Sequence, residues 1–164
     1  MQAIDTSALR YDRTDADSYE AADLNRVGAM CRTISDAATA AISAIAALRA
    51  QYGTAESAYT LPDFSAPTVT AKTDFAMTDT YTLEQMQRYL LNVRNIVEQF
   101  PPLSYQALPG TMRYLVSARA NAIEWDLKQS AENLKSRADQ TEINIKNTAA
   151  AFAYSGEIFA GGIL

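Results

Sequence analysis

The chain contains no histidine, a single cysteine and no hydrophobic run of membrane-spanning length. Without histidine, it lacks the commonest general base, the commonest zinc-binding nitrogen ligand and the usual pH switch near neutrality. Cys31 has no second cysteine in its chain, so neither an internal disulfide nor a CxxC metal site can form. We therefore predict no catalytic residue, no metal site and no cofactor, and interpret Cys31 as a small buried core residue.

Signals for secretion or membrane insertion are also missing. Residues 1–17 carry acids and arginines where a signal peptide needs an apolar core. The uncharged stretch from Ala37 to Leu48 is too short, and too rich in alanine, serine and threonine, to cross about 30 Å of hydrocarbon. We therefore expect a soluble protein made in the cytoplasm, without membrane contact.

The net charge is −5, and the acidic excess lies in the N-terminal half. In the second half, the basic residues are spread out and interleaved with acids, which is typical of a solvated helix face and argues against a nucleic-acid partner. An acidic group precedes the first predicted helix and enters its first turn. Its members are Asp12, Asp15, Asp17, Glu20 and Asp23. This group lacks the glycine and the final glutamate of an EF-hand loop, so we interpret it as helix caps and dipole partners rather than as a calcium site.

The strongest pattern is a helical seam whose members follow one another at alternating steps of three and four residues. They are Leu24, Val27, Cys31, Ile34, Ala38, Ala41, Ile45, Leu48 and Tyr52. This repeat keeps one stripe facing a partner helix. Because Ala37 to Leu48 carries no charge and is mostly alanine, neighbours can approach it closely, as in the centre of a bundle or an oligomer. Gly28 predicts close packing against another backbone.

The patterns together predict a mainly α protein with a single domain, 1–164, built as a three-helix bundle. Thr82 and Gln85 form a capping-box pattern, and Pro101 and Pro102 end the helix that follows. Ser117 is a second candidate start for the main part of the last helix. The predicted parts are an extended arm (1–18), a helix (19–52), an extended connection (53–81), a helix (82–100), a helix (111–148) and a docking tail (149–164).

The connection and the tail both favour contacts with other subunits. A connection of this length is uncommon within a compact domain, and its apolar anchors indicate a segment laid over a surface. It can follow a helix or cross to a neighbour, and the alternation at residues 68–71 leaves room for one edge strand. The tail docks on a second subunit or folds back on its own bundle. Its apolar residues include Phe152, Tyr154, Ile158, Phe159, Ile163 and Leu164.

Carboxylates at positions 124 and 126 flank the only tryptophan. Two carboxylates can perform acid–base chemistry, but residues two apart on a helix point in different directions. We therefore interpret Glu124 and Asp126 as solvated surface groups. Trp125 is interpreted as an anchor in the core or in an interface.

Four pieces of the chain carry a family resemblance. The run TLEQMQRYLLNV, residues 82–93, resembles a segment of small structural proteins of tailed phages and prophages of Gram-positive gut bacteria. Similar pieces occur in the same order at 22–28, at 108–112 with 120–124, and at 154–157. The resemblance implies a virion component of the tail or baseplate region, with no catalytic residues to carry over.

The predicted function is that of a non-enzymatic virion structural protein, made in the cytoplasm of the bacterial host. We expect it to form a homo-oligomer and to contact other virion proteins. The alternative is a host-directed adaptor or receptor-binding module, in which surface tyrosine and tryptophan side chains contact a cell-envelope ligand. The predicted interface residues are Leu24, Val27, Ile34, Ala38, Ala41, Ile45, Leu48, Trp125, Phe152, Tyr154, Ile158, Phe159 and Leu164.

Overall fold

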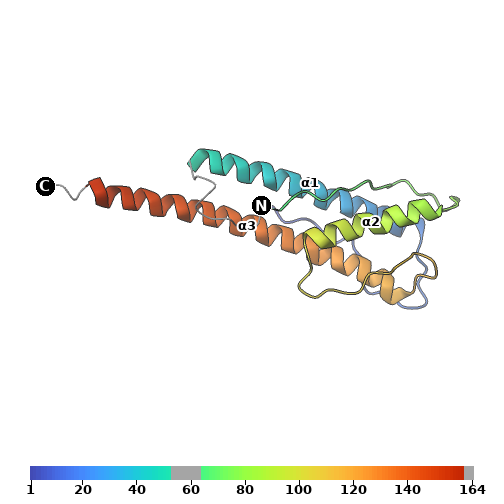
Figure 1. Ribbon diagram of the computed structural model, residues 1–164. Helices are drawn as coiled ribbons and strands as arrows, with labels where there is room; N and C mark the ends of the chain where they lie inside the picture. The colour runs from blue at the N-terminus through green and yellow to red at the C-terminus, as the bar shows by residue number, and fades with distance from the viewer. Residues whose placement is uncertain (53–63, 161–164) are drawn as a thin grey trace.

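The computed structural model describes residues 1–52 and 64–160, and within these ranges it contains three helices and no strand (Figure 1). They are α1 (Ala21–Tyr52), α2 (Leu83–Gln99) and α3 (Ser117–Ala160). Buried side chains from all three helices share one core. The prediction of a mainly α three-helix bundle is confirmed.

The three helices run in the same direction, and each is preceded by an extended segment that runs the opposite way (Figure 1). We call these segments the arm (1–20, before α1), the first return segment (64–82, before α2) and the second return segment (101–116, before α3). In an up-down bundle, short loops join antiparallel neighbours. Here the chain must instead travel back along the bundle before each new helix begins.

Hydrogen bonds define the direction of each extended segment. The amino group of Met1 lies 2.6 Å from Oδ1 of Asp139, whereas Ser117 Oγ donates to Asp15 at 2.5 Å, so the arm runs antiparallel to α3. The first return segment runs antiparallel to both α1 and α2 in the same way. Its bonded pairs are Pro67 with Ser35, Ala71 with Arg32 and Phe75 with Asn25 on α1, and Ser65 with Gln99, Thr68 with Asn95 and Thr70 with Asn92 on α2.

This topology accounts for the long connection. The 32 residues of α1 span about 48 Å at 1.5 Å per residue. An extended chain needs about 15 residues to return over that distance, at about 3.3 Å per residue. A connection to a parallel helix therefore has to be long, and its described part lies on the helices of its own chain. No strand forms at residues 68–71, where the alternation left room for one.

The backbone of the extended segments is bonded by asparagine side chains instead of by a neighbouring strand. Asn92 accepts from the Thr70 N–H at 3.0 Å and donates to the carbonyl of the same residue at 3.1 Å. Asn25 of α1 bonds both backbone groups of Phe75, and Asn121 of α3 does the same for Arg13. One carboxamide on each helix therefore supplies the donor and the acceptor that an extended residue requires.

The helical seam faces the core along most of its length. Its seven members from Leu24 to Ile45 are buried, Leu48 is half-buried and Tyr52 is exposed. A Cβ atom added to Gly28 would lie 2.5 Å from the Lys72 carbonyl oxygen, which confirms the predicted close approach of another backbone. That backbone belongs to the first return segment.

Two helix boundaries differ from the predicted ones by more than two residues, both of them in the third helix. The third helix begins at Ser117 rather than at residue 111, because Tyr114 has a left-handed backbone with a φ of 57° that a right-handed helix cannot include. It also continues to Ala160 rather than ending at 148, since Ala149 to Ala151 are strong helix formers. Residues 149–160 of the predicted docking tail are therefore the last turns of α3, and residues 161–164 lie outside the described residues.

Beyond the end of α2, α1 and α3 continue side by side (Figure 1). Arg137 Nη1 donates to the Gln99 carbonyl at 2.9 Å, which marks the level at which α2 ends along α3. We call the part beyond this level the two-helix extension, consisting of residues 37–52 of α1 and 139–160 of α3. Ala38, Ala41 and Ile45 are its buried contacts on the α1 side.

Candidate functional site

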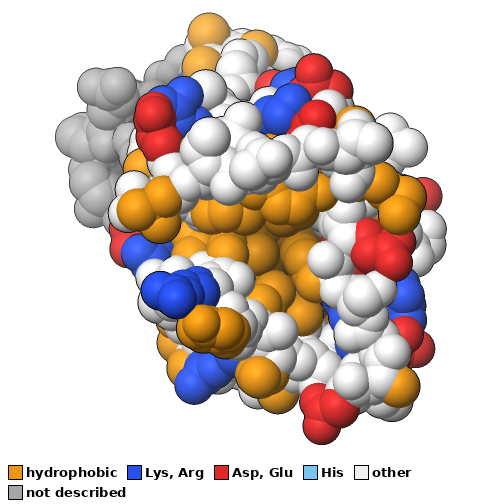
Figure 2. Space-filling model, turned by 90° about the vertical axis from the view of Figure 1, so that its right-hand side faces the viewer, with side chains coloured by type: hydrophobic (Ala, Val, Ile, Leu, Met, Phe, Trp, Pro, Cys, Tyr) orange, Lys and Arg blue, Asp and Glu red, His pale blue; other side chains and the backbone are white. Residues whose placement is uncertain are grey.

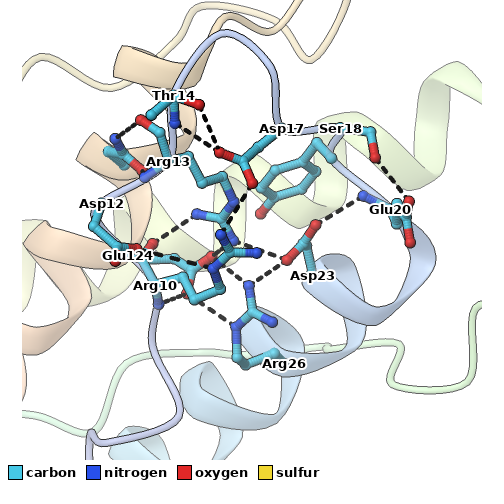
Figure 3. Close-up of polar contacts among 12 residues, drawn as sticks. Arg10, Asp12, Arg13, Thr14, Asp17, Ser18, Glu20, Asp23, Arg26 and Glu124 are labelled. Carbon is cyan, nitrogen blue, oxygen red and sulfur yellow. Dashed lines mark hydrogen bonds and ion pairs between the residues drawn. The ribbon is translucent and has the colours of Figure 1, made fainter.

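The largest group of buried charges joins the arm, α1 and α3 (Figure 3). Arg13 Nη2 lies 2.5 Å from Glu124 Oε1 and 2.8 Å from Asp23 Oδ1. Arg26 binds the same two carboxylates, with Nη2 2.8 Å and Nε 3.0 Å from the two oxygens of Glu124. The backbone N–H of Arg10 adds a bond of 2.6 Å to Glu124 Oε2. Two positive and two negative side chains thus neutralise one another inside the fold.

The pKa shifts in this cluster favour the charged forms. Burial opposes ionisation of Asp23, but hydrogen bonds from the Glu20 N–H, Arg13 and Arg26 outweigh it and lower its pKa. The hydrogen bond to Glu124 raises the pKa of Arg26. Each carboxylate already accepts hydrogen bonds from several donors, so the cluster has little spare capacity to bind a substrate. We interpret it as the site that fastens the arm to the bundle.

A pair of tyrosines extends this network to α2. The Arg13 guanidinium carbon lies 5.1 Å from the centre of the Tyr19 ring, in cation–π geometry. The Tyr19 hydroxyl is 2.5 Å from that of Tyr89 in α2. Burial raises the pKa of Tyr89 well above its ordinary value. The phenol pair therefore stays protonated at neutral pH and connects the arm to α2.

The interpretation of Glu124 and Asp126 as solvated surface groups is wrong, because neither residue has exposed surface. They do point in different directions, as predicted for residues two apart on a helix. Glu124 faces the arm and α1, whereas Asp126 Oδ1 accepts a 3.0 Å bond from the Gln106 N–H of the second return segment. Oδ2 of Asp126 has no hydrogen-bond partner in the described structure. Burial raises the pKa of Asp126 to about 6.

Trp125 serves as an anchor within the chain. Its Nε1 donates to the Ser104 carbonyl at 3.3 Å, and its ring meets that of Tyr11 edge to face, with the centroids 5.4 Å apart. The Lys128 ammonium lies over both rings. Trp125 therefore holds the arm and the second return segment on α3.

Two arginines predicted to lie on a solvated face instead bind other parts of the fold. Arg94 donates to the Pro109 carbonyl at 3.1 Å and is half-buried. Arg137, whose bond to the end of α2 is described above, also lies 5.3 Å from the centre of the Phe64 ring. For these two residues the prediction is wrong, because backbone carbonyl groups outside helical hydrogen bonding need donors. Arg94 supplies one to the second return segment, and Arg137 supplies one to the last residue of α2.

A cleft of about 400 Å³ opens between α1, α2 and the first return segment. It is lined by residues that include Cys31, Lys72, Arg88 and Tyr89. Burial raises the pKa of Cys31 to about 12, so its thiol is a poor nucleophile at neutral pH. Among the described residues, no cysteine or carboxylate groups are arranged to hold a metal ion. The cleft therefore offers space without an evident catalytic group.

The predicted interface residues fall into three groups. Six of the seven on α1 are buried within their own chain, and the seventh, Leu48, is half-buried, as is Trp125 on α3. Phe152, Tyr154, Ile158 and Phe159 lie on the last turns of α3, where only the backbone is described, and Leu164 lies outside the described residues. The predicted interface residues of α1 therefore lie mostly within the core of their own chain.

Comparison with known protein families, with curated proteins and with solved structures finds no match for this chain. In the described part of the chain, no helix is both long and apolar enough to cross a membrane. The function must therefore be inferred from the exposed surfaces of this chain. Two of these surfaces are uncharged or apolar: the outer side of α1 in the two-helix extension, and the end of the bundle at which the helices begin.

Proposed function

We propose that this chain is a structural protein of a tailed-phage virion, which forms a homo-oligomer in the tail or baseplate region. In this proposal, copies pack side by side through the outer surface of α1 in the two-helix extension, and other virion proteins bind the resulting assembly. The family resemblance of residues 82–93 favours the phage setting. The geometry of the extension favours the assembly role.

The observation that carries the proposal is a second stripe on α1, beside the buried seam. Ala40, Ala44, Ala47 and Gln51 are exposed, and their steps of four, three and four repeat the spacing of the seam. Residues at these steps lie on one face of a helix. The stripe contains no charged residue and no large side chain, so the helix of another copy can approach it closely.

The monomer that carries this stripe has a hydrophobic core of its own. The buried charge cluster and the asparagine carboxamides join the arm and both return segments to the helices. Each copy can therefore fold by itself and then associate as a preformed unit, without the entropic cost of folding at the interface. This is the behaviour expected of a subunit that is made separately and then incorporated into a particle.

Size-exclusion chromatography with multi-angle light scattering, over a range of concentrations, tests the proposal. We expect the wild-type chain to form assemblies larger than the monomer. Ala44→Glu and Ala47→Glu each place a charge in the stripe. Each should raise the protein concentration needed for association at least tenfold. Ala29→Glu is the matched control, because Ala29 is an exposed alanine of α1 outside the extension.

Mixing experiments with the tail and baseplate proteins of the same particle complete the test. A co-eluting complex with such a protein is the expected result. A compact monomer at every concentration that binds none of these proteins would contradict the proposed function.

A further inference from the structure

The end of the bundle at which the helices begin is hollow and apolar. Figure 2 views the molecule from this end and shows hydrophobic side chains gathered in a central depression, surrounded by polar side chains and backbone. Next to the three helix starts, several hydrophobic residues are packed against the core but remain partly exposed. They are Tyr19, Tyr81, Met86, Met112 and Leu115. We call this depression the end hollow.

Large hydrophobic side chains are also exposed at the same end. Leu83, the first residue of α2, is 70% exposed, and Val116, which precedes α3, is 55% exposed. Tyr114 is 83% exposed and has the left-handed backbone described above. A non-glycine residue in this region is held there by its surroundings at some cost, and such outliers cluster at functional sites. Exposed apolar patches of this kind mark binding surfaces.

Two acidic residues at this end are paired with arginines of the same chain. Glu84 binds Arg88 at 3.0 Å, and Asp17 binds Arg10 at 3.2 Å. Because all three helices run in the same direction, their positive dipole ends meet at the end hollow, whereas α1 and α3 present negative ends at the far side of the molecule. In an antiparallel bundle these dipoles would largely cancel. Here they favour contact between opposite ends of two copies.

The far end of the molecule is apolar in sequence. α3 extends beyond the end of α1 as a single helix (Figure 1). From Thr148 to Ala160, Glu157 is the only charged residue, among alanines, two phenylalanines and one isoleucine. Both this end of α3 and the end hollow are therefore rich in apolar residues. One end of the chain thus has an apolar depression, and the other end has an apolar projection.

We propose that copies of this chain stack head to tail, with the last turns of α3 of one copy inserted into the end hollow of the next. The proposal rests on the proposed assembly function and adds the direction of that assembly. A contact between two different surfaces of the same chain produces a ring if the copies close on themselves, and an open-ended stack if they do not. Since the helices of successive copies point the same way, the stack is polar.

Two substitutions on one helix test the contact. Leu83→Glu places a charge at the end hollow, at a helix start where glutamate is compatible with folding. Leu91→Glu makes the same change at another exposed leucine of α2, away from that end. We expect Leu83→Glu to shorten the assemblies, as measured by light scattering and electron microscopy, whereas Leu91→Glu should leave their length unchanged. Circular dichroism verifies that both variants fold.

Disulfide trapping tests the geometry directly. Leu83 and Phe159 lie near opposite ends of the same molecule (Figure 1), so cysteines at both positions cannot join within one copy. Under mild oxidation, the double variant Leu83→Cys/Phe159→Cys should give a ladder of multimers. A mixture of the two single variants should stop at dimers. Leu91→Cys/Phe159→Cys is the control and should give no ladder.

The outcomes separate this inference from the proposed function. If the wild-type chain assembles but Leu83→Glu has no effect and no ladder forms, head-to-tail stacking is wrong and the assembly function stands. Trapping of a different virion protein at Leu83→Cys, instead of a second copy, also overturns stacking. If the wild-type chain stays monomeric and binds no virion protein, the proposed function itself fails.

Discussion

Arg13 and Glu124 lie 111 positions apart in the sequence, yet Nη2 of Arg13 is 2.5 Å from Oε1 of Glu124 and both side chains are buried. Arg13 belongs to the arm and Glu124 to α3, so this pair joins a segment without regular secondary structure to the longest helix. Asp23 and Arg26 complete the charge balance from α1. The cluster explains how an extended arm keeps a defined path along a helical bundle.

Replacing Glu124 with glutamine should strongly destabilise the fold. Glu124→Gln leaves Arg13 and Arg26 with only Asp23 as a counter-charge in a buried site, and breaking such a network costs about 3 kcal/mol. Denaturant unfolding followed by circular dichroism measures this change. Glu132→Gln, at an exposed position of the same helix, should change the free energy of unfolding by less than about 0.5 kcal/mol. Equal losses in both variants would contradict a structural role for the cluster.

Asp126 should make the protein less stable as the pH rises through 6. Its pKa in the folded chain, about 6, lies above the ordinary value of 3.8, so the folded state binds its proton more tightly than the unfolded state does. The stabilisation from this group is therefore complete below pH 4 and is lost as the pH rises. Asp126→Asn cannot ionise, and should exceed the wild type by about 1 to 3 kcal/mol at pH 7.5.

Unfolding curves between pH 4.5 and 8 test this prediction. The lower limit keeps the Asp23 carboxylate ionised. Its pKa is lowered, so its contribution to the stability of the fold disappears only in stronger acid. The advantage of Asp126→Asn should shrink towards pH 4.5. Asp36→Asn, at an exposed position of α1, should follow the wild-type curve. A constant difference between Asp126→Asn and the wild type across this range would show that Asp126 does not titrate as inferred.

Gly28→Ala should destabilise the fold although alanine is the better helix former. The added Cβ would lie 2.5 Å from the Lys72 carbonyl oxygen, so the first return segment would have to move away from α1. We expect a net loss of about 2 kcal/mol after the gain of about 1 kcal/mol in helix propensity. Gly110→Ala is the matched control, because nothing lies within 4 Å of its added Cβ. Thermal unfolding of the two variants distinguishes these cases.

Asn92→Asp should loosen the first return segment locally. The aspartate keeps an acceptor for the Thr70 N–H but loses the donor to the Thr70 carbonyl, and its charge would be buried near that oxygen. A loss of about 1 to 3 kcal/mol is expected. Hydrogen exchange should show faster exchange at Thr70 and its neighbours. Asn147→Asp, at an exposed position of α3, should leave exchange at Thr70 unchanged.

Local sequence signals predicted the helices well where their caps and breakers are strong. The Thr82–Gln85 capping box and Pro101 place α2 within a residue of its observed bounds, and both reciprocal bonds of the box are present. Gly28 correctly indicated a close backbone, because a glycine inside a good helix needs a steric reason. These features depend on neighbours in the sequence, so the sequence alone could reveal them.

The direction of the helices and the buried carboxylates could not be predicted in this way. A 3.6-residue period gives the buried face of a helix but not whether the next helix is parallel to it. Glu124 resembles a surface residue until its partner Arg13, far away in the sequence, is placed beside it. The sequence also carried no sign that asparagines on the three helices bond the extended backbone, since a single asparagine in a sequence resembles any exposed polar residue.

The parallel arrangement of the helices also has a consequence for biosynthesis. The arm is translated before α1, but Asn121, Glu124 and Asp139, which bind it, belong to the helix that is translated last. Contacts between such distant residues slow folding, because the intervening chain must be closed into a loop first. The arm must therefore leave the ribosome with its binding surface still missing, and can reach its final position only after most of the chain has been synthesised.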